Sequence, residues 1–304
     1  MLGGVLAGLA AGALWGLVFV LPAMAPGLSA VDLAAGRFVS YGAVAVIVMA
    51  QRRGSRPLPT ARQAWVALGL SVVGFSGYYL LLVLAIHDIG AEVPTLVIGT
   101  IPLWVMLLGK PQGLLWRNLL PGLVLTVAGV LLMMNAESAH VLVAGEPIRT
   151  VSGWIYWRGL AFALLAMASW TAFAVLNSAW LQKHRDIDTT DWANWLGVGA
   201  GLAALAVWLV LGSDANVLLA RADIAQAAML CIAAGVGSAW LATVLWNIAS
   251  RRLSASLCGQ LIVSETLFAL AYVFLWTGQW PQSTQLMASA LFLLGILASV
   301  RAHR

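Results

Sequence analysis

Residues 252–268, "RLSASLCGQLIVSETLF", align without a gap on residues 88–104, "DIGAEVPTLVIGTIPLW". Ala91 falls on Ala255, Ile98 on Ile262 and Leu103 on Leu267. The two stretches are mainly apolar, and each lies in a different half of the chain. Similar segments at a fixed separation indicate an internal repeat.

Two further pairs of segments match in the same order. "LTVAGVLL" (125–132) falls on "LFLLGILA" (291–298), glycine on glycine, and "LWGLVF" (14–19) falls on "SWTAFA" (169–174), with Trp15 on Trp170. The separation between partners is nearly constant along the chain. We therefore expect two related halves.

Composition places both halves in a membrane. The chain of 304 residues is 62% hydrophobic and 9% charged, whereas a soluble domain carries about 25% charged residues. A helix of about 20 apolar residues crosses the hydrocarbon core of a bilayer. The sequence predicts ten such spans: 3–22, 30–50, 64–86, 93–109, 118–134, 159–181, 192–211, 225–248, 255–276 and 284–300.

Ten spans divide evenly between the halves. Residues 1–134 form a first five-helix repeat, 135–158 a connecting loop outside the membrane, and 159–304 a second five-helix repeat. Because five is odd, the second repeat is inverted relative to the first. Inverted repeats are typical of secondary transporters, which bind substrate near the midplane between the repeats. The expected fold is all-α and polytopic, with two inverted five-helix repeats around a central cavity.

The basic residues predict the orientation. If the N-terminus is cytoplasmic, three basic residues lie in outer loops, Arg149, Arg158 and Arg221, against twelve on the cytoplasmic side. The twelve are Arg52, Arg53, Arg56, Arg62, Lys110, Arg117, Lys183, Arg185, Arg251, Arg252, Arg301 and Arg304. Cytoplasmic loops carry an excess of Lys and Arg, so we expect both termini in the cytoplasm and no role for this basic charge in binding nucleic acid.

Several chemistries lack their usual motifs. The sequence has no Walker A motif and no His/Cys cluster with metal-ligand spacing. Cys231 and Cys258 fall in apolar runs and are interpreted as packing residues. We expect no catalytic residue, metal or cofactor, and the partners expected are a small-molecule substrate and membrane lipid, with the oligomeric state left open.

The chain resembles the drug/metabolite transporter superfamily, EamA type, over essentially its whole length. The resemblance lies in "AGALWGLVFV" (11–20), "GAEVPTLVIGTIPLWVMLLG" (90–109), "LTVAGVLLMM" (125–134) and "SASLCGQLIVSETLFAL" (254–270). Within that family, the tryptophan-rich spans are most similar to the aromatic amino acid exporters. The resemblance implies a bacterial inner-membrane protein whose spans three, four, six, eight and nine line the cavity.

Four spans place polar or aromatic residues at helical spacing, which predicts one face of each span. These faces favour either a shared wet cavity or hydrogen-bonded packing between helices, and the agreement of four spans favours the cavity. The candidate substrate-binding residues are Trp15, Phe75, Tyr78, Tyr79, Leu82, Trp170, Phe173, Asn177, Trp240, Thr243, Asn247, Gln260 and Ser264.

Two charges lie within predicted spans. Glu265 is near the middle of span nine, where a charge costs at least about 2.5–3.5 kcal/mol to insert. It is either a coupling or substrate-binding acid or a structural one, and the family resemblance favours the structural role. Arg37, in span two, could pair with Asp88 or Glu92 of the next outer loop, or reach the membrane surface as an interfacial anchor, and the anchor is favoured.

Three residues are candidates for gating. Gly12 and Gly16 belong to a stripe of glycines four residues apart, which lets another helix approach closely and favours tight packing over a sliding gate. Pro102 removes a hydrogen bond in the middle of span four and is a candidate hinge.

The predicted function is export of aromatic or apolar amino acids from the cytoplasm by alternating access, with or without proton coupling. An alternative keeps this fold but exports drugs, cations or nucleosides. A less favoured alternative is an intramembrane enzyme acting on a lipid or isoprenoid, which would need clustered acids or a metal site.

Overall fold

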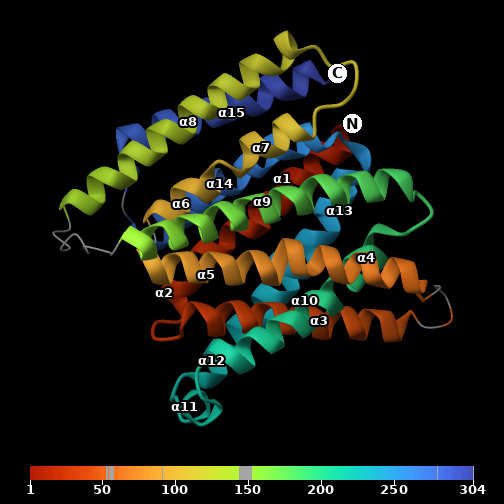
Figure 1. The fold of residues 1–304 in the computed structure, drawn as a ribbon, viewed down its shortest axis with the longest axis vertical. Helices are drawn as coiled ribbons and strands as arrows, with labels where there is room; N and C mark the ends of the chain where they lie inside the picture. The colour runs from red at the N-terminus through yellow and green to blue at the C-terminus, as the bar shows by residue number, and fades with distance from the viewer. Residues whose placement is uncertain (53, 55–57, 91, 144–152, 279, 304) are drawn as a thin grey trace.

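The computed structural model describes residues 1–52, 54, 58–90, 92–143, 153–278 and 280–303. Every regular element in these ranges is a helix (Figure 1). Within them, nine helical runs are long and apolar enough to cross a membrane, and a shorter apolar run, Val93–Leu108, occupies the place of span four. The predicted all-α polytopic fold is confirmed.

In the first half of the chain, the helices follow the predicted spans closely. Their bounds are α1 (Leu2–Gly16), η1 (Leu17–Phe19), α2 (Leu21–Met24), α3 (Ala30–Gln51), α4 (Ala61–Ser71), η2 (Val72–Ser76), α5 (Gly77–Ile89), α6 (Glu92–Gly99), α7 (Ile101–Leu108) and α8 (Trp116–Val143). Span three is one continuous run of α4, η2 and α5. Span four is divided at Thr100, and Pro102 lies in the first turn of α7, where a missing backbone N–H is tolerated.

The second half repeats this pattern. Its elements are α9 (Gly153–Lys183), α10 (Thr189–Leu211), α11 (Ala215–Leu219), α12 (Ile224–Ala234), η3 (Gly235–Leu241), α13 (Ala242–Arg252), α14 (Ala255–Thr277) and α15 (Ser283–Ala302). Side chains cap equivalent helices in both halves: Ser29 accepts a hydrogen bond from the backbone N–H of Asp32 at the start of α3, and Asp188 caps α10.

The connection between the halves is shorter than the predicted loop 135–158. α8 continues to Val143 and α9 begins at Gly153, so Trp154, Tyr156 and Trp157 are helical. Arg149 lies outside the described residues. Aromatic residues at a membrane interface are compatible with either a loop or a helix end, which is why composition alone did not locate the helix boundaries.

The contacts between helices follow a pattern that relates the two halves of the chain. Spans two and seven (α3 and α10) pack together at one edge of the bundle, spans five and ten (α8 and α15) at the other, and spans four and nine (α7 and α14) in between. Span three against six (α5 and α9) corresponds to span eight against one (α13 and α1). This arrangement is unchanged when the halves are exchanged.

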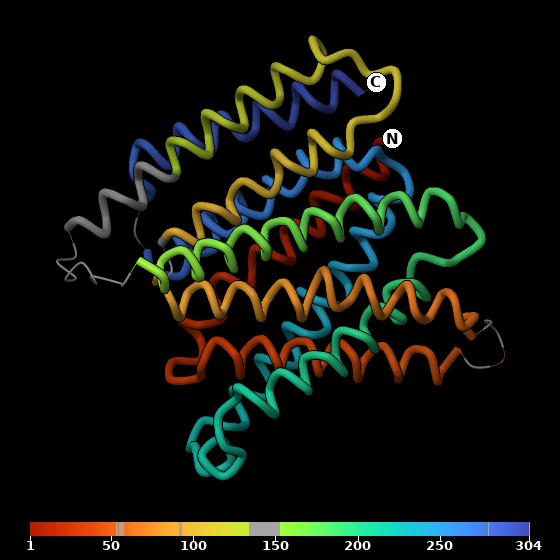
Figure 2. Tube along the Cα trace, in the orientation of Figure 1, coloured from red at the N-terminus to blue at the C-terminus, as the bar shows by residue number. Residues whose placement is uncertain are grey.

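Both chain termini lie at the same end of the bundle (Figure 2). We call this the N/C end and the other the opposite end. The first turn of α4, the last turn of α9 and the last turn of α13 meet the N/C end, and they carry Arg62, Lys183, Arg251 and Arg252.

Two equivalent spans contain a π-helical turn. In span three it is η2 (Val72–Ser76), and in span eight it is η3 (Gly235–Leu241). A π turn is wider than an α turn, so it rotates the helix that follows. Along span three, Ser71 and Ser76 bond to carbonyl groups of α10, and Tyr79 bonds to the Ala30 carbonyl of α3, which packs beside α10.

Candidate functional site

The interior is closed at the N/C end by a buried amide network. Asn177 of α9 donates to the Asn247 side chain of α13 at 3.0 Å, and it accepts from the indole N–H of Trp192 at 2.7 Å. Asn177 and Asn247 are both fully buried. Trp240 donates to the Asn194 side chain at 2.8 Å, and Thr243 is buried one turn before Asn247. Three of the predicted cavity residues, Asn177, Trp240 and Asn247, therefore join helices in this conformation.

A second buried network surrounds α14. The Gln260 amide bonds to the Thr126 hydroxyl of α8 at 2.9 Å, and its oxygen accepts from the Ser299 hydroxyl of α15 at 3.1 Å. Ser264 donates to the carbonyl of Leu261 at 2.7 Å. Gln260 and Ser264 are buried, so their polar groups are satisfied by packing partners here rather than by solvent.

Backbone contacts complete the closure at this end. The N–H of Ser256 donates to the Gly109 carbonyl at 3.0 Å, and the Gln182 amide donates to the Leu253 carbonyl at 2.7 Å. Arg251 donates to the Ile187 carbonyl. These contacts join spans four, six and nine and the connection before α10.

Towards the opposite end, α14 and α5 have fewer fully buried positions. Along α14, residues 256–264 are all buried, whereas residues 265–268 are all partly exposed. On α5, residues 77–84 are all partly exposed, with no fully buried position among them. A helix packed on one side and facing lipid on the other would alternate between buried and exposed positions. Partial exposure all round means that these segments are packed less closely than residues 256–264.

A continuous row of aromatic rings lies where the closed and open parts meet. The rings pack mostly edge to face, with centroid distances of 5.2 Å for Trp246–Trp15, 6.3 Å for Trp15–Trp170, 6.2 Å for Trp170–Phe173 and 5.1 Å for Phe173–Phe75. Phe75 then contacts Phe38 and Tyr41. We call these seven residues the aromatic ladder; it joins the two hydrophobic cores of the bundle.

Glu265 faces this region from α14. It is the eleventh residue of a 23-residue helix, about 15 Å from the N/C end of α14 at 1.5 Å per residue. The Glu265 carbonyl lies beside Gly16 of α1, so Trp15 is at nearly the same depth. Its side chain is partly exposed, and no hydrogen bond to it occurs within the described ranges.

Arg37 approaches the same space from α3. Its guanidinium is within electrostatic range of Glu265, Tyr78 and Tyr79, and it lies 4.4 Å from the ring centroid of Phe38. The Arg37 Nε is buried, without a hydrogen-bond partner in the described part of the chain. The alternative in which Arg37 pairs with Asp88 was wrong, because Asp88 binds Arg158 through two hydrogen bonds of 2.7 Å. The side chain of Glu92 lies outside the described part of the structure.

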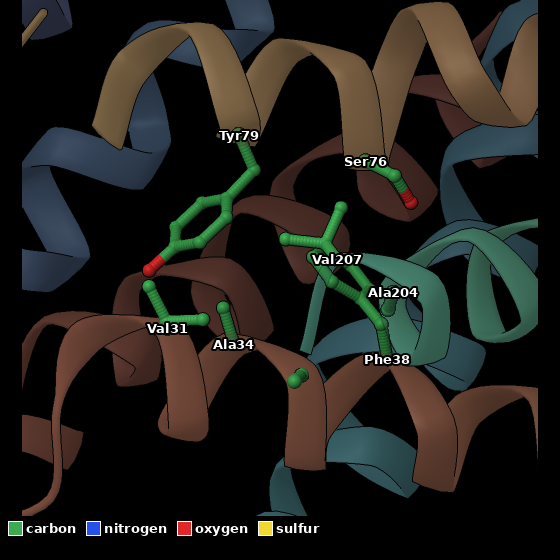
Figure 3. Close-up of a pocket in the computed structure, with 8 residues that line it drawn as sticks. Val31, Ala34, Phe38, Ser76, Tyr79, Ala204 and Val207 are labelled. Atoms are coloured by element: carbon green, nitrogen blue, oxygen red, sulfur yellow. The ribbon is translucent and has the colours of Figure 1, made fainter. Parts of the chain in front are cut away.

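The remaining predicted binding residues lie on α5. Tyr78 packs against the core around α14, Leu82 is partly exposed, and Tyr79 donates to the Ala30 carbonyl. Figure 3 shows Tyr79 and Ser76 above Val31, Ala34 and Phe38, around a cavity of about 10 Å³. This volume has room for about one water molecule.

A larger cavity of about 350 Å³ lies between α3, α10 and α12. Its acidic lining residue, Asp32, accepts hydrogen bonds from Ser29, Trp208 and Ser213. Arg37 and Glu265, which have no such partners among the described residues, are therefore the stronger basis for a site.

The candidate gating residues lie at close helix contacts. Gly12 faces Ser264, and a Cβ on Gly16 would stand 2.8 Å from the backbone nitrogen of Ala269. This is the close packing that the glycine stripe favoured, here against α14. Pro102 is buried at the start of α7. Whether these residues move remains a prediction.

The sequence analysis placed Arg37 inside a span without naming it as a binding residue, and it missed Trp192 and Trp246. An ionisable residue inside a span is a functional candidate by default, so the signal for Arg37 was present. Trp192 and Trp246 were each one among fifteen tryptophans, and no local pattern separates an interior indole from one that faces lipid.

Known proteins match this chain in sequence and in fold. The model of the EamA-like transporter family matches residues 2–135. Inner membrane protein YtfF of Escherichia coli (strain K12) is 32% identical over 316 residues, covering 99% of this chain and 96% of that protein. A solved crystal structure of a protein superposes with a TM-score of 0.75 at 18% identity, covering 99% of this chain and 98% of its own; this match shows the fold alone.

These matches define the class of protein: a multi-pass membrane transporter of the drug/metabolite type. The chain belongs to the EamA-like transporter family. None of the matched names states a cargo, and none points to an aromatic amino acid exporter in particular.

Proposed function

We propose that this transporter exports aromatic or apolar amino acids by alternating access across a bacterial inner membrane. The observation that carries the proposal is the aromatic ladder, whose partly exposed members are Trp15 and Trp170. The exposed parts of these two indoles offer a surface against which another aromatic ring can stack. The resemblance of the tryptophan-rich spans to the exporter YddG supports the same cargo.

The orientation assigned is that of the sequence argument. The N/C end, which carries most of the basic residues, faces the cytoplasm, and the opposite end faces outward. On this assignment the conformation described is closed to the cytoplasm and open outward. The relative YtfF is named as an inner membrane protein, which supports the bilayer assigned.

Export requires the closure at the N/C end to open. The contacts that would separate include Asn177–Asn247, Ser256–Gly109 and Gln182–Leu253. Asn177, Asn247, Gln260 and Ser264 would then meet the substrate in the inward-facing state. This keeps their predicted binding role in a conformation other than the one described.

Transport in proteoliposomes tests the proposal. Vesicles containing the protein are given labelled phenylalanine, tryptophan, threonine, a nucleoside or a lipophilic cation, with and without a pH gradient. We expect uptake of phenylalanine and tryptophan above protein-free vesicles and above the other solutes. Uptake of the nucleoside or the cation in their place would replace the cargo and leave the transporter assignment standing.

The comparison of transport with and without the pH gradient determines whether transport is coupled to protons. Equal rates with and without the gradient indicate facilitated transport. A rate that follows the gradient indicates proton coupling, for which Glu265 is the candidate acid.

A further inference from the structure

We propose that Arg37 and Glu265 bind the two charged ends of a zwitterionic amino acid, Arg37 its carboxylate and Glu265 its ammonium group. The inference rests on the proposed function, because it names the chemistry by which that same interior selects its cargo. It adds a charge-based filter to the aromatic ladder. Its physical basis is that Arg37 and Glu265 carry opposite charges within electrostatic range of each other but form no ion pair in the described part of the chain.

The charges come from separate helices. Arg37 is on α3 and Glu265 on α14, and Tyr78 of α5 is within electrostatic range of both. Neither a hydrogen bond nor an ion pair joins Arg37 to Glu265 in the described part of the chain. They are thus near enough to interact and too far apart to satisfy one another.

Asp88 and Asp32, two other acidic residues of the bundle, are paired or hydrogen-bonded. Asp88 is held by Arg158, and Asp32 receives hydrogen bonds from Ser29, Trp208 and Ser213. A charge removed from water is costly unless it is paired and hydrogen-bonded. The unpaired Arg37 and Glu265 consequently favour a ligand that supplies both an anion and a cation.

An α-amino acid has this chemistry. Its carboxylate can accept from the planar guanidinium of Arg37, and its ammonium group can donate to the Glu265 carboxylate. Both protein charges lie next to the aromatic ladder, Arg37 at Phe38 and Glu265 at the depth of Trp15. A ligand between them would have its side chain within reach of these rings. A plain amine or a plain acid would leave one protein charge unpaired.

Competition by analogues tests the inference. In wild-type proteoliposomes, labelled tryptophan competes with unlabelled tryptophan, with tryptamine, which lacks the carboxylate, or with indole-3-propionate, which lacks the ammonium group. We expect each analogue to compete at least about tenfold more weakly than tryptophan, because one charge-assisted contact is lost. Analogues that compete as well as tryptophan would overturn the inference while leaving an aromatic carrier in place.

Variants assign each charge to its end of the ligand. We expect Arg37→Gln to weaken competition by unlabelled tryptophan by about tenfold or more and to leave competition by tryptamine unchanged. Glu265→Gln should weaken competition by tryptophan similarly and leave competition by indole-3-propionate unchanged. Arg62→Gln removes an arginine at the N/C end and serves as the matched control, with no change expected.

A double variant separates binding from a structural charge balance. If the charges only neutralise each other, Arg37→Gln/Glu265→Gln restores tryptophan competition that each single variant lost, and the inference fails. If they bind the zwitterion, the double variant stays as weak as the weaker single one. Thermal unfolding followed by tryptophan fluorescence verifies folding, and Arg37→Lys with Glu265→Asp replaces any variant that does not fold.

Failure of the cargo and failure of the inference give different results. If tryptophan is not recognised but alanine or threonine is, and both single variants abolish this recognition, the aromatic cargo is wrong and the zwitterion site stands. If no zwitterion is recognised, both are wrong.

Discussion

Asn177 shows how a single side chain closes one end of the interior. It satisfies the indole N–H of Trp192 and bonds to Asn247 of another helix while being fully buried. Removing its side chain leaves the Trp192 N–H without an acceptor and the Asn247 oxygen without a donor, and each unpaired group costs about 1–3 kcal/mol.

We therefore expect Asn177→Ala to lower the free energy of unfolding by about 1–3 kcal/mol in detergent. Asn216→Ala, at an exposed position in α11, is the control and should change it by less than about 0.5 kcal/mol. Denaturant titration followed by tryptophan fluorescence measures both. Equal effects for the two variants would mean that the amide network contributes little.

The glycines of α1 make a second prediction at this scale. A Cβ on Gly16 would stand 2.8 Å from the backbone nitrogen of Ala269, which no side-chain rotation can relieve. Gly16→Ala should destabilise the protein by about 1–3 kcal/mol through overpacking.

Gly69 is the matched control, because a Cβ there meets nothing within 4 Å. Gly69→Ala in the interior of α4 should stabilise by up to about 1 kcal/mol through helix propensity. A stable, active Gly16→Ala would show that α1 and α14 are not held this closely.

Some of these residues could be identified from the sequence, and others could not. Glu265 and the aromatic positions could be identified because an acid or a cluster of large rings stands out in an apolar run. The partners of Asn177 could not, because Asn247 and Trp192 reach it from other helices and their contacts depend on helix rotation. Arg37 was found as an intramembrane charge, but its direction required the packing of α3.

At the scale of elements, the halves of the chain share devices that sequence periodicity does not show. The π turns of spans three and eight are equivalent in position, yet hydrophobic periodicity assumes a constant turn along each span. The break in span four, by contrast, could be predicted, because Pro102 cannot donate to a helical hydrogen bond.

Replacing that proline tests its role as a hinge. We expect Pro102→Ala to favour a continuous span four and to slow transport several-fold, because the segments α6 and α7 would no longer turn separately. Pro94→Ala lies near the start of α6 and should leave the rate unchanged. Equal rates for Pro102→Ala and the wild type would remove Pro102 from the mechanism.

The ion pair between Asp88 and Arg158 joins spans three and six near the opposite end. The Asp88 side chain is 3% exposed, so Asp88→Asn should lower the melting temperature. The control is Asp223→Asn, in the connection before α12, where the Arg221 guanidinium lowers the pKa of Asp223 by hydrogen bonding.

The contribution of Asp223 is present above its ordinary pKa and is lost only as the pH falls through the lowered value. At neutral pH, an exposed pair of this kind contributes little. Asp223→Asn should therefore leave the melting temperature nearly unchanged. A larger loss for Asp223→Asn than for Asp88→Asn would contradict this ranking.

For the whole molecule, the proposed direction of transport depends on which end faces the cytoplasm. Labelling of single cysteines in intact cells measures this, after Cys231 and Cys258 are replaced by alanine. A membrane-impermeant maleimide should label Asn216→Cys at the opposite end but not Asp186→Cys at the N/C end. Permeabilised cells should label both, and the reverse pattern in intact cells would invert the orientation.

The spans could be read from apolar runs, and their division into two repeats stays a prediction from weak matches between residues 88–104 and 252–268. The conformation could not, because the same sequence must also support a state with the N/C end open. Burial of residues 256–264 beside partly exposed residues 265–268 is a property of one packed arrangement.

Counterflow tests directly whether the protein carries tryptophan by alternating access. Proteoliposomes are loaded with excess unlabelled tryptophan and diluted into a trace of labelled tryptophan, without any ion gradient. A carrier with one alternating site predicts a transient accumulation of label above equilibrium, absent from vesicles loaded with a nucleoside. Label that never exceeds its equilibrium level would contradict alternating access for this cargo.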